Sequence, residues 1–576
     1  MNQKLENILN VSLDATEDEL RKADSLSTGY NWRDNTWEII VKYSGSLESI
    51  RNRYNVYIKE LLNYYAIIVA DKATIELISQ EDVIDYVEKP KSLYYQIERT
   101  KTAACVGSVR ADGNILSGKG VIVGVIDTGI DIFDNAFRNS DGTTRILNIY
   151  DQTTGEKYDK QSIDEYIRLN EDLSGGTFSY DNAPGVDNIM HGTDVSYIAA
   201  GCLGVAYEAD IIAVKMGYSI NNQFPRTTSL MDAIDYIIRK AIEYRKPVAV
   251  NISYGCNYGA HNGNTLLESF IDDISKSYRC VICVGSGNEA DKAIHFGGII
   301  NTGQVQTAYL SVGEYQSAID IQIWKNYWDT IDVMLINPRG EQIGIITEGR
   351  INRYETYNTE IITLLGEPSP YNIYQEIYIN LIPKTDYILS GIWQIVLMAG
   401  SIRAGEYNIW LPSSQALGYA TAFNNPTADG TITIPATARN CIAVGAYNAY
   451  TNSYAAFSGR GFDNSIRNVN AGVKPDITAP GVDISIARQR GNDITYRNVT
   501  GTSYAVPVVT GAAALLMQWG IVMGNDRFMY GEKLKAALID GSKPVGLVGI
   551  TRNDNQPDPR TGWGAVCLKN TLNKIL

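Results

Sequence analysis

The feature that most constrains this chain is the alternation of short apolar runs with amphipathic segments between residues 121 and 284. The runs are five or six residues long and largely apolar on both faces: Val121–Ile126, Ile211–Met216, Val248–Ile252 and Cys280–Val284. Between them, apolar residues in 227–244 and 264–276 recur with the 3.6-residue period of a helix. Buried strands separated by such helices form a parallel sheet that is covered on each side. The pattern predicts a doubly wound α/β domain.

This α/β pattern is interrupted and later resumed. Across 294–430 the apolar period changes to two, and the short segments are parted by Gly, Pro and Asn, which predicts an inserted all-β domain whose strand pattern resembles a jelly roll. Buried-strand and helix patterns return in 431–576, with a long helix of small residues from Ser503. Residues 1–96 alternate strand and helix signals and predict a small α+β domain. The expected organisation is therefore 1–96, 97–293, 294–430 and 431–576.

Composition and charge exclude several functions. The chain has 50 Lys and Arg against 64 Asp and Glu, a net charge of −14, which repels nucleic acid. The first thirty residues lack the apolar core of a secretory signal, so we expect no export by this route. No run approaches 18 uninterrupted apolar residues, so we expect no membrane span.

The seven cysteines are odd in number and scattered, which predicts reduced thiols rather than a disulfide framework. Cys280 and Cys283 have CxxC spacing, but they lie inside an apolar run. Positions three apart face opposite sides of a strand, so we interpret the two as buried thiols and not as a metal or redox pair.

Four polar residues lie at the ends of predicted elements. Asp127 ends a buried strand, where open α/β sheets bind ligands, and Asn288 follows another within a glycine loop. His191 and Ser503 each open a predicted helix. Asp127, Asn288 and Ser503 each have an ordinary structural explanation, since Asp, Asn and Ser commonly form turns or cap helices. The chain holds only three histidines, so a histidine-dependent mechanism has few candidates.

Their order, Asp, His, Asn, Ser, and their local contexts resemble the subtilisin family of serine proteases. The matching motifs are VIDTGID around Asp127, HGTDVSYIAAG from His191, GTSYAVP around Ser503, NISYG at 251–255, GSGNEA at 285–290 and KPDITAPG at 474–481. The chain departs from the family's usual HGTHV and GTSMAAP at Asp194, Tyr504 and Val506. These positions flank the predicted triad. The departures therefore leave the details of the substrate subsites open, and they do not argue against the activity.

The resemblance implies specific roles. Asp127, His191 and Ser503 would form the catalytic triad, and Asn288 would contribute to the oxyanion hole. An extended substrate would bind along two segments: Ser253, Tyr254 and Gly255, and Gly285, Ser286 and Gly287. Residues 1–96 would be a prodomain that remains bound in cis or after self-cleavage near Gln96. No metal site or cofactor is predicted, although structural Ca²⁺ occurs in the family.

The prodomain, the lack of a signal peptide, and the β insert between Asn288 and Ser503 together resemble the Csp germination proteases of clostridial spore-formers. That resemblance implies limited proteolysis of a spore cortex hydrolase precursor (SleC-like), in the mother-cell cytoplasm and the spore. Two alternatives are a catalytically silent or prodomain-locked regulator of germinant signalling, and a general intracellular subtilase. The insert would be either a stabilising buttress or a docking surface for a protein substrate.

Overall fold

The computed structural model describes residues 4–17, 20, 27, 29–61, 64–90, 103–107, 110–111, 114–171, 183–217, 225–344, 346, 351–368, 372–462, 472–490, 493–546 and 557–576. It divides into two compact units, Met1–Tyr95 and Gln96–Leu576. Each unit has a hydrophobic core of its own.

The first unit is an antiparallel sheet with helices on one face. Its elements are α1 (Asn7–Asp14), β1 (Tyr30–Asn31), β2 (Thr36–Tyr43), α4 (Glu48–Tyr54), β3 (Tyr57–Leu61), β4 (Tyr65–Ala70), α5 (Lys72–Ile78) and β5 (Ile84–Glu88). The strand order is β1-β2-β4-β3, and β5 also pairs with β2. Along β2, Trp37, Ile39, Val41 and Tyr43 are buried in alternation, so one face forms the core with α1, α4 and α5. The predicted N-terminal α+β fold is confirmed.

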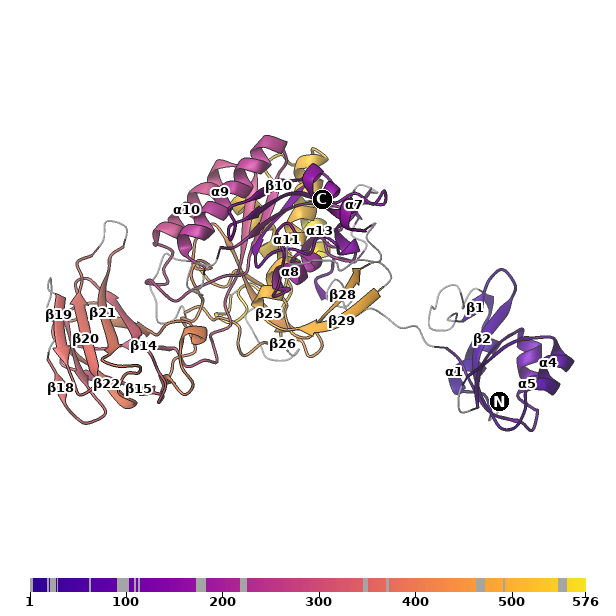
Figure 1. Ribbon diagram of the computed structural model, residues 1–576, viewed down its shortest axis with the longest axis horizontal. Helices are drawn as coiled ribbons and strands as arrows, with labels where there is room; N and C mark the ends of the chain where they lie inside the picture. The colour runs from indigo at the N-terminus through magenta and orange to yellow at the C-terminus, as the bar shows by residue number, and fades with distance from the viewer. Residues whose placement is uncertain are drawn as a thin grey trace. The chain divides into compact units, whose positions relative to one another are not determined.

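The second unit is built on a nine-stranded sheet (Figure 1). Its strands, in spatial order, are β10 (Lys157–Asp159), β9 (Ile146–Asp151), β11 (Asp210–Lys215), β8 (Ile122–Asp127), β12 (Val248–Ile252), β13 (Cys280–Gly285), β25 (Ile442–Asn448) and β26 (Ser453–Tyr454), with β27 (Ile477–Pro480) also on β25. All pairs are parallel except those of β10 and β26. The predicted parallel sheet is confirmed.

Helices cover both faces of this sheet. Alternate residues of a strand point to opposite faces, so they pack into two different hydrophobic cores. Ile122 and Ile126 of β8 pack with α9 (Thr227–Tyr244) and α10 (Leu266–Ser277). Val123 and Val125 pack with the helices of the other face: α8 (His191–Ala200), α11 (Thr502–Met517), α12 (Gly531–Asp540) and α13 (Leu568–Ile575). The remaining elements are β6 (Arg110–Ala111), β7 (Asn114–Ile115), η1 (Asn135–Phe137), α7 (Lys160–Glu171), β28 (Ile484–Arg490), β29 (Asp493–Val499) and η4 (Gln518–Val522).

Among the described residues, one helical segment, Thr502–Val522, is long and apolar enough to cross a membrane by composition. Buried residues make up 83% of its most apolar window. Its side chains pack in the core with β8, β13 and α8, so its apolar character is that of a central core helix.

The insert consists of two antiparallel sheets that share one core. One sheet has the order β14 (His295–Ile299), β23 (Glu406–Trp410), β16 (Ile319–Asn326), β21 (Tyr374–Pro383), β20 (Thr359–Leu365), β19 (Ile351–Glu355). The other has the order β18 (Gln342–Ile343), β17 (Ile331–Ile336), β22 (Gly391–Ala399), β15 (Val305–Val312), β24 (Ala422–Phe423), and a short helix, η3 (Ser414–Ala416), links β23 to β24. This is a two-sheet sandwich, and its assignment as a jelly roll stays a prediction.

The cysteine prediction is wrong for two of the seven residues. Cys105 and Cys567 form a disulfide that joins positions 462 apart in sequence, with their Cα atoms 4.8 Å apart. Cys280 and Cys283 are buried and unbonded to each other, as expected. A composition argument cannot detect that the start and the end of the second unit meet in space.

Candidate active site

Asp127 and His191 form a hydrogen-bonded pair at one edge of the parallel sheet. Asp127 is the last residue of β8, and His191 is the first residue of α8. His191 Nδ1 lies 2.7 Å from Asp127 Oδ1. A carboxylate only accepts hydrogen bonds, so Nδ1 carries a proton, and Nε2 is left to accept one whenever the imidazole is neutral.

A glycine permits this close approach of α8 to the end of β8. A Cβ atom at Gly192 would lie 2.3 Å from the carbonyl oxygen of Gly129 and 2.9 Å from Asp127 Cβ. Any larger residue would therefore push His191 away from Asp127. This explains why the motif needs glycine directly after its histidine.

The environment of His191 favours its protonated form. Burial lowers the pKa of the imidazole, but the charge of Asp127 and its hydrogen bond, with a further contribution from Asp187, raise it. The nearby Arg497 acts in the opposite direction. The net result is a His191 pKa above its ordinary value of 6.5.

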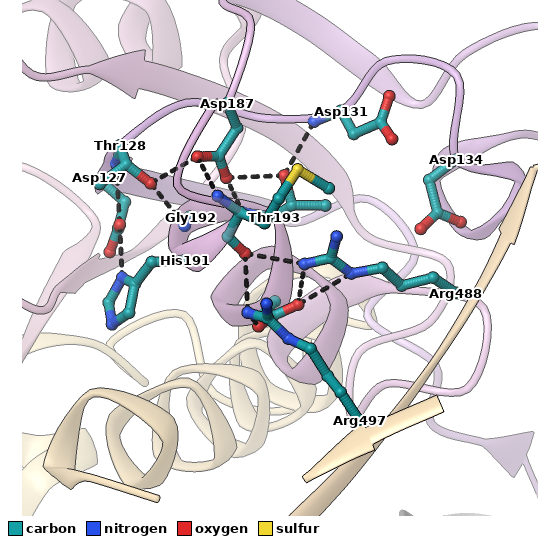
Figure 2. A network of polar contacts seen from close by, with 12 residues as sticks. Asp127, Thr128, Asp131, Asp134, Asp187, His191, Gly192, Thr193, Arg488 and Arg497 are labelled. Atoms are coloured by element: carbon teal, nitrogen blue, oxygen red, sulfur yellow. Dashed lines mark hydrogen bonds and ion pairs between the residues drawn. The ribbon is translucent and has the colours of Figure 1, made fainter. Parts of the chain in front are cut away.

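Asp187, which the sequence analysis missed, supports both members of this pair. It is fully buried and accepts hydrogen bonds from Thr128 Oγ1 at 2.8 Å, from the Met190 N–H at 2.7 Å and from the Thr193 N–H at 2.8 Å. Thr128 Oγ1 in turn accepts from the Gly192 N–H at 2.9 Å (Figure 2). An acidic residue just before a predicted helix was the available signal, because such residues often cap the first turn.

Ser503 lies in the first turn of α11, beside the Asp127–His191 pair. Gly501, with φ 151°, precedes the helix, and the ring of Tyr504 lies 5.2 Å from the ring of His191, centroid to centroid. Within the described part of the chain, no hydrogen bond joins the Ser503 hydroxyl to His191. Catalytic hydrogen bonds of this type often tighten only in complexes with substrate.

Asn288 is held against the same helix N-terminus. Its Oδ1 accepts from the Thr502 N–H at 3.0 Å and from the Thr502 hydroxyl at 3.1 Å. With Oδ1 engaged in this way, the Nδ2 amide is the group that can donate to a substrate oxygen. In the first turn of α11, the Thr502 N–H donates to Asn288 and the Tyr504 N–H donates to the Gly501 carbonyl, so the Ser503 N–H, which has no acceptor within the helix, is the further donor at this edge.

The two expected substrate-binding segments follow neighbouring strands. Ser253, Tyr254 and Gly255 come after β12, and Gly285, Ser286 and Gly287 end and follow β13, which pairs with β12 in parallel. Ser253 Oγ lies 3.4 Å from the Ser503 carbonyl oxygen. The Ser286 backbone is already bonded to Val444 and Thr433, so its N–H and C=O are directed into the protein.

A cavity of about 530 Å³ lies beside Tyr254 and Gly255. Its wall is largely apolar and includes Met216, Leu230, Leu267, Ile434 and Pro435. The insert contributes Ser413, Gln415 and Ala416, which sequence reasoning did not connect with the site. Glu289, the neighbour of Asn288, anchors this part of the insert by accepting from the Ser414 N–H at 3.1 Å and its hydroxyl at 3.2 Å.

Two further expectations concern processing and metals. Gln96, the expected processing position, lies outside the described residues. Among the residues that the structure describes, no group of three or more His, Cys, Asp or Glu side chains is placed to hold a metal ion. The expectations on cofactors and on structural Ca²⁺ stay untested.

Comparison with known proteins decides the family. Residues 118–368 and 404–564 match the subtilase family, Peptidase S8. The chain belongs to the subtilase family. In this subtilase, residues 3–91 also match the family described as the Csp protease B prodomain.

A solved structure and two curated relatives are similar to this subtilase. The structure of the Clostridium perfringens CspB protease is 34% identical, covers 83% of this chain and 97% of that chain, and has a TM-score of 0.75. The subtilase-type proteinase RRT12 of Saccharomyces cerevisiae is 33% identical over 22% of this chain, and subtilisin-like protease 10 of Arthroderma otae is 34% identical over 21%. The chain spans only 23% and 27% of these two curated relatives. The match to the CspB protease along most of the chain, together with the prodomain match, makes this protein a Csp-like subtilase.

Proposed function

We propose that this chain is a serine endopeptidase in which Asp127, His191 and Ser503 form the catalytic triad. The observation that carries the proposal is the buried Asp127–His191 hydrogen bond, directly beside the helix turn that presents Ser503. The hydrogen-bonded pair and the first turn of α11 meet at the carboxyl edge of a parallel sheet, where doubly wound proteins bind their ligands.

The geometry supports acyl transfer through an acyl-enzyme intermediate. Ser503 Oγ attacks the scissile carbonyl carbon while His191 Nε2 takes the hydroxyl proton, and Asp127 stabilises the imidazolium. The negative oxygen of the tetrahedral intermediate accepts from Asn288 Nδ2 and the Ser503 N–H. The C–N bond then breaks as His191 returns the proton to the leaving amine. Water next attacks the acyl-enzyme with His191 again as the base, and the proton returns to Ser503 Oγ as the acid product leaves.

The substrate is a protein cleaved in extended form. Its backbone pairs with the segment from Ser253 to Gly255, and a large apolar side chain enters the cavity beside Tyr254. The first substrate is the chain itself, because a prodomain of the Csp type precedes the catalytic part. Cleavage near Gln96 leaves the prodomain as a separate chain or a bound inhibitor.

The physiological substrate in this proposal is a spore cortex hydrolase precursor, cleaved during germination by protein stored in the spore. Its support is the similarity to the CspB protease along most of the chain. The regulator alternative is less favoured because all three triad residues are present with Asp127 and His191 bonded.

The decisive experiment is intact mass spectrometry of the full-length protein and its Ser503→Ala variant, before and after a fluorophosphonate probe. We expect wild type to lose its prodomain and gain one adduct on Ser503, and the variant to do neither. Identical N-termini in the two proteins would refute self-cleavage. A second experiment compares two protein substrates. Cleavage of a cortex hydrolase precursor at one position, while casein stays uncleaved, would support the germination role over general proteolysis.

A further inference from the structure

A buried carboxylate lies in the first turn of the helix that begins with His191. Asp194 is three residues after His191, at the position where the family's motif usually has a second histidine, and its side chain is completely buried. A buried charge is strongly unfavourable unless opposite charges and hydrogen bonds compensate it. The chain therefore needs positively charged partners for Asp194, which a neutral histidine at this position would not require.

Two arginines of the β28–β29 hairpin supply these partners. Arg488 Nε donates to Asp194 Oδ1 at 2.9 Å, and its Nη2 also contacts Oδ1. Arg497 forms an ion pair with Asp194 Oδ2. Figure 2 shows both guanidinium groups reaching from the hairpin toward the helix of His191.

The same two arginines also bind the carbonyl oxygen that precedes His191. Arg488 Nη2 donates to the Met190 carbonyl at 2.8 Å, and Arg497 Nη2 donates to it at 3.3 Å. Met190 is the N-cap residue of α8 and has a left-handed backbone, φ 66°. The hairpin thus contacts α8 on both sides of His191, at residues 190 and 194.

The hairpin is continuous with the turn that carries Ser503. Ile486 pairs with Arg497 across the two strands, so Arg488, two residues on, projects from the same face as Arg497. Strand β29 ends at Val499, four residues before Ser503. A link between this hairpin and α8 therefore connects the segment of the nucleophile to the helix of its base.

We propose that Asp194, Arg488 and Arg497 are positioning residues that hold His191 in register with Ser503. This inference rests on the proposed roles of His191 and Ser503. A buried carboxylate between two forked guanidinium groups has few alternative geometries, so it restricts sliding of the hairpin along α8. Proton transfer from Ser503 is sensitive to such sliding, since a misplacement of about 1 Å can cost ~10²-fold in rate.

The link also has an electrostatic signature. The charged groups that act on His191 are Asp127 at the end of β8, Asp187 before α8 and Arg497 on β29. The titratable Tyr504 of α11 also faces the ring of His191. Arg497 lowers the pKa of His191, so its removal raises that pKa. A residue that only stabilised the fold would leave the pH profile of the reaction unchanged.

The test compares three variants of the full-length protein, with turnover of a fluorogenic peptide expressed per mole of processed chain. Asp194→Asn should lower kcat at least about tenfold, with KM within about twofold of wild type. Arg497→Lys keeps the charge but loses the fork, so kcat should fall with no shift of the acidic limb of kcat/KM. Arg497→Gln should lower kcat and move that limb to higher pH.

Arg490→Gln is the matched control, because Arg490 lies on the same hairpin but pairs with Asp131 in the loop after β8. It should lower the melting temperature without changing kcat or the pH profile. If Asp194→Asn fails to fold, the two Arg497 variants carry the test, since that side chain is 40% exposed. The inference is overturned if kcat is unchanged in the folded variants, or if Arg490→Gln reproduces their losses.

Failure of the proposed function gives a different result. If wild type neither turns over peptide nor gains a fluorophosphonate adduct on Ser503, the triad assignment is wrong. If wild type does both and the hairpin variants match it, only the positioning role is wrong.

Discussion

At the scale of single residues, the chemistry depends on which nitrogen of His191 holds its proton. Asp127 accepts from Nδ1 and is almost completely buried, so water does not compete for this bond. The raised pKa of His191 is the measurable consequence of this pairing. It sets the pH above which the imidazole is neutral and able to act as a base.

We therefore predict that kcat/KM increases with pH along an acidic limb whose pKa lies above 6.5. Asp127→Asn should move this acidic limb to lower pH and reduce kcat by a factor of about 10⁴. Because the folded pKa is raised, the pairing stabilises the protein fully below the unfolded pKa and this stability is lost as pH rises through the folded pKa. Rate profiles and melting curves across this range check both points. An unshifted limb in the variant would contradict the assignment of His191 as the base.

A second prediction concerns the oxyanion donor. Asn288→Ala should lower kcat by about 10²–10³, equivalent to roughly 2.7–4 kcal/mol, with a small change in KM. Since Asn288 also accepts from Thr502, the control is Thr502→Val, which removes the hydroxyl contact and keeps the backbone one. Steady-state kinetics that show equal losses in both variants would mean that Asn288 only supports the helix.

At the scale of elements, the insert and the catalytic core meet through polar and aromatic contacts. The Trp410 ring stacks with His261 of the core and with His295 of the insert, at centroid distances of 4.2 Å and 4.9 Å. Glu289 bonds Ser414 close to the cavity. These contacts support the insert as a buttress, and they also bring one of its loops to the proposed substrate pocket.

A substitution in the cavity wall tests whether the cavity binds a substrate side chain. Ala416→Trp should raise KM roughly tenfold for peptides whose large apolar side chain fills the pocket, because the added ring occupies its volume. A small ester substrate that does not reach the pocket should be turned over normally. Tyr419→Trp, which changes a 98% exposed residue of the same loop, is the control. An unchanged KM for long peptides would remove the cavity from substrate binding.

At the scale of the whole molecule, the disulfide ties the first described residues of the second unit to its last helix. Cys105 pairs with Cys567, which is the N-cap residue of α13. A crosslink over such a long loop restricts the unfolded chain. It thereby holds together the start and the end of the catalytic unit.

We predict that Cys105→Ser lowers the free energy of unfolding by about 2–4 kcal/mol under oxidising conditions and has little effect in protein kept reduced. Thiol titration of the denatured wild type should find five reactive groups among the seven cysteines. Cys202→Ser, at an exposed free thiol, is the control. Seven reactive groups without reductant would contradict the bond.

Local sequence patterns were enough to predict the fold class, the interruption by β structure and the positions of the candidate catalytic residues. Each of these follows from patterns a few residues long: apolar periodicity, strand-ending acids and glycine turns. The domain boundaries and the role of each site residue stay predictions until they are measured.

The way in which distant segments combine became visible in the folded chain. The Asp194–Arg488 pair spans 294 positions and the disulfide spans 462, while the pocket wall joins the core to the insert. In sequence, Asp194 is a departure from a motif and its arginines are ordinary strand residues. Buried ion pairs, crosslinks and cavities depend on distances between segments that local patterns do not encode, so they emerge only when the chain is folded.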